Sequence, residues 1–233
     1  MTRPGRICIT VLVLALAAGL LTACSQNNNT DNVNNQESAQ QQEMPDVVNP
    51  DTFVEATLNS IETLDPHFMS SSATTCIAYN VFDSLLSAED GQLQPSLATE
   101  VPAEDNGLIV TDSDGTTHIT FNIREGVTFQ NGNALSAEDV KYTFTRGILV
   151  GSLADLCQAL LGEGSFANLA EKEGLENAYQ IVDDAITIEG QNITFHLPKP
   201  FSPFLDIIAD GGSAYGIFNK AWCIKQGDWS GEF

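Results

Sequence analysis

The sequence predicts a mixed α/β domain behind an exported N-terminal segment, and three patterns in the chain support the domain. Apolar and polar residues alternate from Ile119 to Ile123, which is the period-2 pattern of a half-buried strand. Ser136 precedes a stretch with apolar residues at helical spacing, as a helix N-cap does. Two short apolar runs flank residues 189–192 (EGQN), which is typical of a β-hairpin.

The first residues have the pattern of a secretory signal over residues 1–23. Arg3 and Arg6 precede an apolar run from Ile7 to Leu21, whereas a membrane-spanning helix needs about 20 apolar residues. The tetrapeptide LTAC ends at Cys24 and resembles a lipobox, so we expect cleavage before Cys24 and lipidation of its thiol. An uncleaved anchor helix, in which Cys24 is incidental, is the alternative. Both the lipidated segment and the uncleaved helix predict a domain outside the cytoplasm that is anchored to the cell membrane, in the periplasm or at the cell surface.

Residues 24–50 predict a disordered tether. They are rich in Asn and Gln and contain no Lys or Arg, so they cannot bury enough apolar surface to offset the entropy of ordering. Loss of residues 1–23 removes two of nine basic residues and none of 31 acidic residues, which leaves a formal charge of −24. This charge argues against a nucleic-acid partner. The folded domain is expected over residues 51–233.

The first part of this domain gives weaker patterns. Residues 53–60 alternate like a strand, and Pro66 favours an extended Asp65. Apolar residues recur at helical spacing from about Thr74 to Leu86. Residues 87–117 are acidic and rich in Gly and Pro, so we expect a loop with one short strand near Gly107–Val110.

The second part of the predicted domain gives clearer patterns of secondary structure. Gly126 and the Asn131-Gly132 pair predict turns between the strand and the helix that follows Ser136. We expect Ser136 and Asp139 to form a structural capping arrangement, with four apolar residues on the buried helix face: Ala137, Val140, Phe144 and Ile148.

Residues 153–180 predict loops and short helices. The expected hairpin follows, with strands at residues 186–188 and 193–197. Two prolines end it, and Ser202 can cap a short helix from Phe204 to Ile208.

Several tracts resemble one protein family in collinear order. LDPH at 64–67, YNVFDSLL at 79–86, residues 120–146 and residues 185–210 are similar to the dipeptide/oligopeptide (family 5) extracellular solute-binding proteins. The resemblance implies a periplasmic-binding-protein-like II fold. Family members are longer and close two lobes on a ligand, so the resemblance also implies that this chain is a fragment, an incomplete first lobe whose second lobe is missing.

The resemblance implies a substrate-binding lipoprotein of an ABC importer. Such a protein captures a small solute, in most cases a peptide, and delivers it to the permease subunits. We expect a monomer without a cofactor. The alternative is a surface lipoprotein that acts as a sensor, adhesin or chaperone without transport, because fold does not fix function.

Four residues are candidates for ligand binding. In the family's peptide binders the residues three to five places after LDPH line the cleft, which here are Ser70, Ser71 and Ser72. Their hydroxyl groups can donate and accept hydrogen bonds. A polar loop that caps the next helix is the alternative. Tyr215 follows a glycine pair, where its ring could face the cleft, and a packed surface tyrosine is the alternative.

Three cysteines remain in the folded part: Cys76, Cys157 and Cys223. Outside the cytoplasm one pair of them could form a disulfide and leave one thiol, and their spacing matches no zinc site.

The histidines and serines predict no chemistry. We expect His67 to be structural and His118 and His196 to be lone polar strand residues, because no pair has metal-ligand spacing such as i,i+4. No G-x-S-x-G nucleophile elbow occurs. We therefore do not expect an enzyme.

Overall fold

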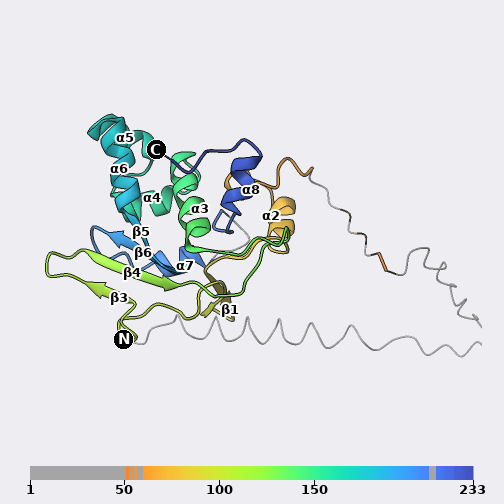
Figure 1. The fold of residues 1–233 in the computed structure, drawn as a ribbon, viewed down its shortest axis with the longest axis horizontal. Coiled ribbons are helices and arrows are strands. Elements are labelled where there is room, and N and C mark those ends of the chain that lie inside the picture. Colours follow the sequence, from red (N-terminus) through yellow and green to blue (C-terminus); the bar gives the residue numbers. More distant parts are fainter. Residues whose placement is uncertain (1–50, 53, 55, 57–59, 210–213, 233) are drawn as a thin grey trace, which may run out of the picture. The chain divides into compact units, whose positions relative to one another are not determined.

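The computed structural model of the chain describes residues 51–232 with the exception of 53, 55, 57–59 and 210–213 (Figure 1). The chain divides into two units, residues 1–54 and 55–233. Of the first, only Asp51, Thr52 and Val54 are described, and all three are exposed. The predicted signal segment, Cys24, the tether and most of the strand-like residues 53–60 lie outside the described residues.

The second unit is built on a four-stranded antiparallel sheet with the order β3-β4-β6-β5. The strands are β3 (Ile109–Thr111), β4 (Thr117–Asn122), β5 (Ile186–Glu189) and β6 (Asn192–Leu197). The predicted hairpin is confirmed as β5–β6. The predicted alternation is confirmed in β4, where Ile119 pairs with Phe195 of β6 and both are buried.

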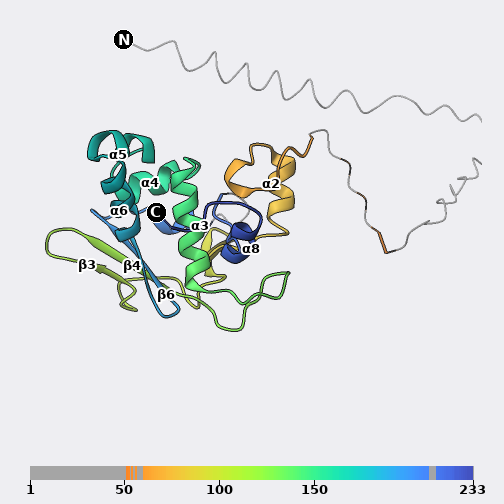
Figure 2. The same ribbon diagram turned by 45° about the horizontal axis from the view of Figure 1, so that its top comes forward.

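Four helices follow β4 in the chain before β5: α3 (Ala137–Leu149), α4 (Ala154–Leu161), α5 (Phe166–Glu173) and α6 (Leu175–Asp184). They cover one face of the sheet in both views (Figures 1 and 2). The predicted face of α3 is buried, and Phe144 packs edge-on against Phe195 with ring centroids 5.0 Å apart. Burial of such rings contributes about 1.5–3 kcal/mol each.

The predicted capping arrangement of α3 is confirmed. The Asp139 carboxylate accepts from the Ser136 N–H (3.0 Å) and hydroxyl (2.7 Å). Its other oxygen accepts from the Lys220 N–H at 2.8 Å. This contact fixes the start of α8 (Lys220–Lys225) beside the start of α3.

The expected helix from Thr74 to Leu86 is wrong in its second half. The 3₁₀ helix η1 (Pro66–Phe68) is followed by α2 (Ser72–Ala78), and the hairpin of β1 (Leu86–Glu89) and β2 (Gln92–Pro95) begins at Leu86. Asp90 (φ 50°) and Gly91 (φ 75°) form its two-residue turn. Asp-Gly is a strong hairpin signal. The sequence therefore contained a signal for this turn, but the helical spacing of the apolar residues led to the prediction of a helix.

The short helix α7 (Phe204–Ile208) is confirmed, but Ser202 does not cap it. Pro203 takes the N-cap position, and no side chain closes that end. Within the described residues, no single helix has the length and apolar character to cross a membrane. Ala137–Leu149 together with Ala154–Glu173, bent by 101°, meets that test by length and composition only.

Candidate functional site

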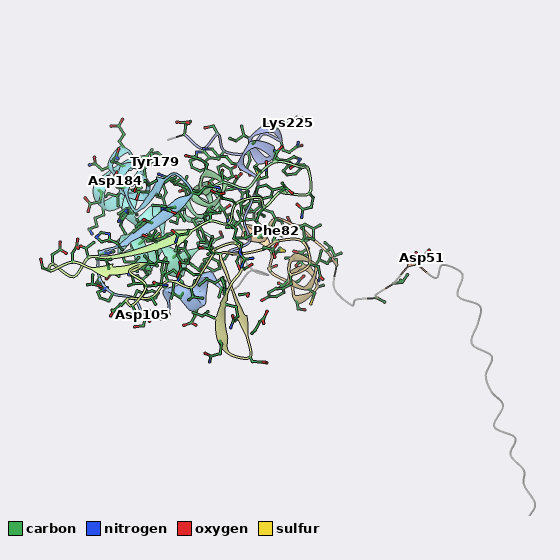
Figure 3. All side chains as sticks on the ribbon, turned by 60° about the horizontal axis from the view of Figure 1, so that its bottom comes forward. Asp51, Phe82, Asp105, Tyr179, Asp184 and Lys225 are labelled. Carbon is green, nitrogen blue, oxygen red and sulfur yellow. The ribbon has the colours of Figure 1, made fainter. Side chains whose placement is uncertain are left out.

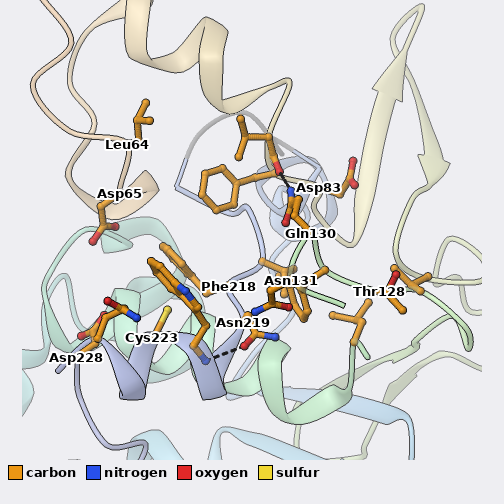
Figure 4. Close-up of a pocket in the computed structure, with 18 of the residues that line it drawn as sticks. Leu64, Asp65, Asp83, Thr128, Gln130, Asn131, Phe218, Asn219, Cys223 and Asp228 are labelled. Atoms are coloured by element: carbon orange, nitrogen blue, oxygen red, sulfur yellow. Dashed lines mark hydrogen bonds between the residues drawn. The ribbon is translucent and has the colours of Figure 1, made fainter. Parts of the chain in front are cut away.

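A cavity of about 1070 Å³ opens between segments that are distant in sequence (Figure 4). Its walls come from residues 64–65, 81–83, 127–131 and parts of 217–228. Ligand sites for small molecules commonly measure about 300–1,000 Å³. The cavity therefore has room for a ligand of the size of a short peptide.

The loop after β4 forms one wall because two hydrogen bonds fix it to other segments. The Gln130 side-chain amide donates to the Val81 carbonyl at 3.0 Å. The Asn133 amide donates to the Asn219 side-chain oxygen at 3.2 Å, and the same oxygen accepts from the Trp222 N–H at 2.7 Å and caps α8. The wall is thus tied to both neighbouring segments.

The cavity combines apolar surface with amide side chains. Leu64, Val81 and Trp222 are 49%, 45% and 51% exposed, respectively, and all three line it. Gln130, Asn131, Asn219 and Gln226 also line it. Each amide offers donors and an acceptor, which are the groups needed to pair with a peptide backbone.

A buried arginine supports the wall from behind. Arg146 of α3 donates to Asp65 at 2.7 and 3.3 Å and to Asp228 at 2.8 Å. Its guanidinium lies 5.1 Å from the centre of the Phe218 ring, and its side chain is only 7% exposed. Asp65, Asp228 and Phe218 all line the cavity. Because a buried charge requires partners, this cluster holds three distant segments in place.

His67 completes the cluster as a neutral side chain. Its Nδ1 atom accepts from Arg146 Nη1 at 2.7 Å. Burial, followed by the Arg146 charge, lowers its pKa from 6.5 to about 4. The Nε2 atom is buried near Gly147 and the backbone of Ala214, without a hydrogen bond of normal geometry. These contacts agree with the structural role predicted for His67.

The three candidate serines lie at the start of α2 and do not line the cavity. Ser71 is the N-cap, with its hydroxyl oxygen 3.3 Å from the Thr74 N–H. Ser70 and Ser72 are exposed. Helix capping describes the contacts of Ser71, and ligand binding by the three serines stays a prediction.

Tyr215 is 8% exposed and belongs to the hydrophobic core. Its ring lies 6.2 Å from that of Phe144. Its role in ligand binding also stays a prediction. The adjacent glycine pair and Ser213 lie outside the described residues.

The three cysteines of the folded part are free thiols, so the disulfide considered for them is absent from the structure. Cys76 is exposed, whereas Cys157 and Cys223 are buried. Burial raises the pKa of both buried thiols to about 11. Of the three, only Cys223 lines the cavity.

His118 and His196 are not lone residues, contrary to the prediction. They pair across β4 and β6 with their Nδ1 atoms 2.7 Å apart. Asp112 and Thr187 bond their outer nitrogens at 3.0 and 2.7 Å. Among the described residues, no group of three or more His, Cys, Asp or Glu side chains could hold a metal ion.

Neither the cavity nor the arginine cluster was predicted. Their members are separated by about 80 residues, so no local pattern connects them. One signal was present in the sequence: the basic residues are few, and one of them, Arg146, lies in the last turn of the helix that was predicted to bury one face.

One comparison with known proteins identifies a family. Residues 92–229 match the model of the bacterial extracellular solute-binding proteins, family 5 Middle. No curated protein matches the chain.

Three solved structures share the fold. The substrate-binding domain of an oligopeptide ABC transporter from Bacillus anthracis is 16% identical, with a TM-score of 0.53 over 71% of this chain and 29% of that one. OppA of Listeria monocytogenes bound to peptide is 16% identical, with a TM-score of 0.50 over 73% and 35%. The pheromone receptor PrgZ is 21% identical, with a TM-score of 0.50 over 71% and 30%.

These matches confirm the predicted mixed α/β fold of the periplasmic-binding-protein-like II type, of which the chain represents a part. The chain spans about a third or less of the length of these structures. The family profile covers more than half of the 233 residues. The chain belongs to family 5 of the bacterial extracellular solute-binding proteins.

Proposed function

We propose that the chain belongs to the solute-binding component of an ABC importer, which captures peptides outside the cytoplasm and delivers them to membrane permease subunits. The observation that carries this proposal is the cavity, which places amide side chains beside exposed apolar ones. The similar structures named for oligopeptides or solved with peptide support the choice of ligand.

In this proposal the cavity recognises what all peptides share. Side-chain amides such as Gln130 and Asn131 pair with the peptide main chain, and the apolar rim receives a side chain. Backbone pairing gives affinity with broad sequence tolerance. Ser70, Ser71 and Ser72 are the contacts that the family resemblance adds, and Tyr215 is the contact that its place after the glycine pair adds. In the whole protein a second lobe would close over the ligand.

The proposal includes membrane attachment through Cys24. A diacylglycerol on this thiol would hold the chain at the membrane, since buried lipid contributes about 0.8 kcal/mol per CH₂. The tether of residues 24–50 would let the domain reach the permease. Full-length chain expressed in a bacterial host should partition into the detergent phase of Triton X-114, and Cys24→Ser should move it to the aqueous phase. Equal partitioning of both would contradict lipidation.

Isothermal titration calorimetry with peptides of two to five residues tests the ligand class. We expect saturable binding of peptides and none of free amino acids or sugars. Trp222→Ala removes an apolar wall of the cavity and should weaken peptide binding. Val110→Ala on β3, which removes an equally exposed apolar side chain outside the cavity, should not. Identical peptide affinities of the two variants would contradict the proposal that this cavity is the peptide-binding site.

Binding without import would favour the sensor, adhesin or chaperone alternative. Uptake of a radiolabelled peptide by cells that express the chain together with a candidate permease separates these cases. The importer requires uptake that depends on the chain.

A further inference from the structure

We propose that the cavity selects peptides with a cationic group beside an apolar side chain, and that Asp83 is the carboxylate that accepts the cation. This inference rests on the proposed function, because it specifies the ligand of the same cavity. It follows from the charges that line the cavity and from which of them already have partners.

The cavity mouth is apolar and exposed. Leu64, Val81 and Trp222 line it while about half of each residue remains exposed to water. Large exposed apolar residues gathered around a concave surface mark interaction sites more often than isolated ones do. A ligand side chain that covers them would therefore be apolar.

The charges of the lining have one sign. Among the described residues that line the cavity there are three aspartates, Asp65, Asp83 and Asp228, and no Lys, Arg or His. Arg146 behind the wall bonds two of them, Asp65 and Asp228. The positive charge of Arg146 balances only one of the negative charges of Asp65 and Asp228, so this part of the wall has a net negative charge.

Asp83 differs from the other two carboxylates in its contacts with the described residues. No hydrogen bond or ion pair of its side chain is present among the described residues. The backbone of Asp83 is nevertheless held in place, because its main-chain carbonyl accepts from the Ile217 N–H at 2.9 Å. Figure 4 places Asp83 on one side of the cavity, with Asp65 and Asp228 on the other.

Asp83 is exposed, and an exposed charge still acts on a ligand group that lies within about one Debye length, roughly 8–10 Å. A ligand ammonium or guanidinium near Asp83 is therefore attracted, and a ligand carboxylate is repelled. The net charge of the chain, −22, acts in the same direction on the approach of ligands. Basic peptides should bind more tightly than acidic peptides.

Three capped pentapeptides test the inference. They are identical except for a central lysine, glutamine or glutamate between two phenylalanines, and their acetyl and amide ends remove the terminal charges. Titration calorimetry with the purified chain should give a dissociation constant about tenfold lower for the lysine peptide than for the glutamate peptide.

Matched variants assign this preference to one residue. Asp83→Asn should reduce the ratio to about threefold or less and leave the glutamine peptide unchanged. Asp105→Asn removes the same charge from another exposed aspartate, on a loop away from Phe82 of the cavity wall (Figure 3), and should keep the tenfold ratio.

The outcomes separate the two proposals. Failure of all three peptides to bind overturns the proposed function and this inference with it. Equal binding of the lysine and glutamate peptides overturns the inference alone. A preference that survives Asp83→Asn, or that Asp105→Asn removes equally, assigns selectivity to overall charge and overturns the role of Asp83.

Discussion

Replacing Arg146 with methionine should destabilise the folded unit by about 3 kcal/mol. The guanidinium makes hydrogen bonds with Asp65, Asp228 and His67 at 2.7–3.3 Å. Methionine fills a similar volume but donates no hydrogen bond. The variant therefore tests whether this cluster holds the cavity wall together.

The magnitude follows from burial. Removal of one partner from a buried ion pair costs about 3–5 kcal/mol, because the other charge stays buried without compensation. The side chain of Arg146 is 7% exposed, whereas those of Asp65 and Asp228 are 27% and 28% exposed. Water can reach the two carboxylates once Arg146 is gone, so the lower end of the range applies.

Urea unfolding followed by tryptophan fluorescence and circular dichroism measures this loss. Thermal unfolding provides a second measurement. A loss of 1 kcal/mol in the free energy of unfolding lowers Tm by about 2–4 °C in a domain of this size, so Tm should fall by about 6–12 °C. Lys141→Met is the matched control on the same helix. Its ion pair with Asp183 is equally short, 2.7 Å, but more exposed, at 23% and 43%, and should contribute about 1 kcal/mol or less.

A loss below about 1 kcal/mol for Arg146→Met, or the same loss for both variants, would refute this reasoning. A double-mutant cycle with Asp228→Asn adds a second check. The combined loss should be smaller than the sum of the single losses, because the two side chains share one interaction.

Three further predictions concern pH, packing and thiol reactivity. The pKa of His67 is about 4 in the folded chain, whereas the ordinary value of 6.5 applies to the unfolded chain. Between these two pH values the unfolded chain therefore binds a proton at His67 that the folded chain does not bind. Stability should fall by up to about 1.4 kcal/mol per unit as pH falls through this window, and His67→Gln should flatten the slope of unfolding free energy against pH. Gly147→Ala should lower Tm, because the new methyl group would lie 2.3 Å from a Leu153 atom, whereas Gly164→Ala, with open space, should not. Iodoacetamide should label the exposed Cys76 before the buried thiols, and equal labelling in peptide mass spectrometry of the folded chain would contradict the burial.

Local structure could be predicted where the neighbouring residues determine it. Alternation in β4, the capping pair Ser136 and Asp139, and the hairpin β5–β6 all depend on residues within a few positions of each other. The expected helix through Leu86 failed because two rules competed there. Apolar spacing favoured a helix, whereas the turn at Asp90-Gly91 pairs β1 with β2.

The site could not be predicted because distant pairings build it. Arg146 meets partners 81 and 82 positions away in both directions, and His118 meets His196 across 78 positions. Asp83 lies in the YNVFDSLL tract that carries part of the family resemblance, but only the fold shows that it lines an apolar cavity. The family resemblance drew attention to the serines after LDPH instead.

Hydrogen–deuterium exchange of the chain with and without a saturating mixture of short peptides tests the central claim most directly, namely that this cavity is the ligand site. Peptide should slow amide exchange in residues 127–131 and 217–228, which form its walls, and leave β3 and the turn before β4 unchanged. Slower exchange around Asp112 and His118 with no change in the cavity walls would contradict the account.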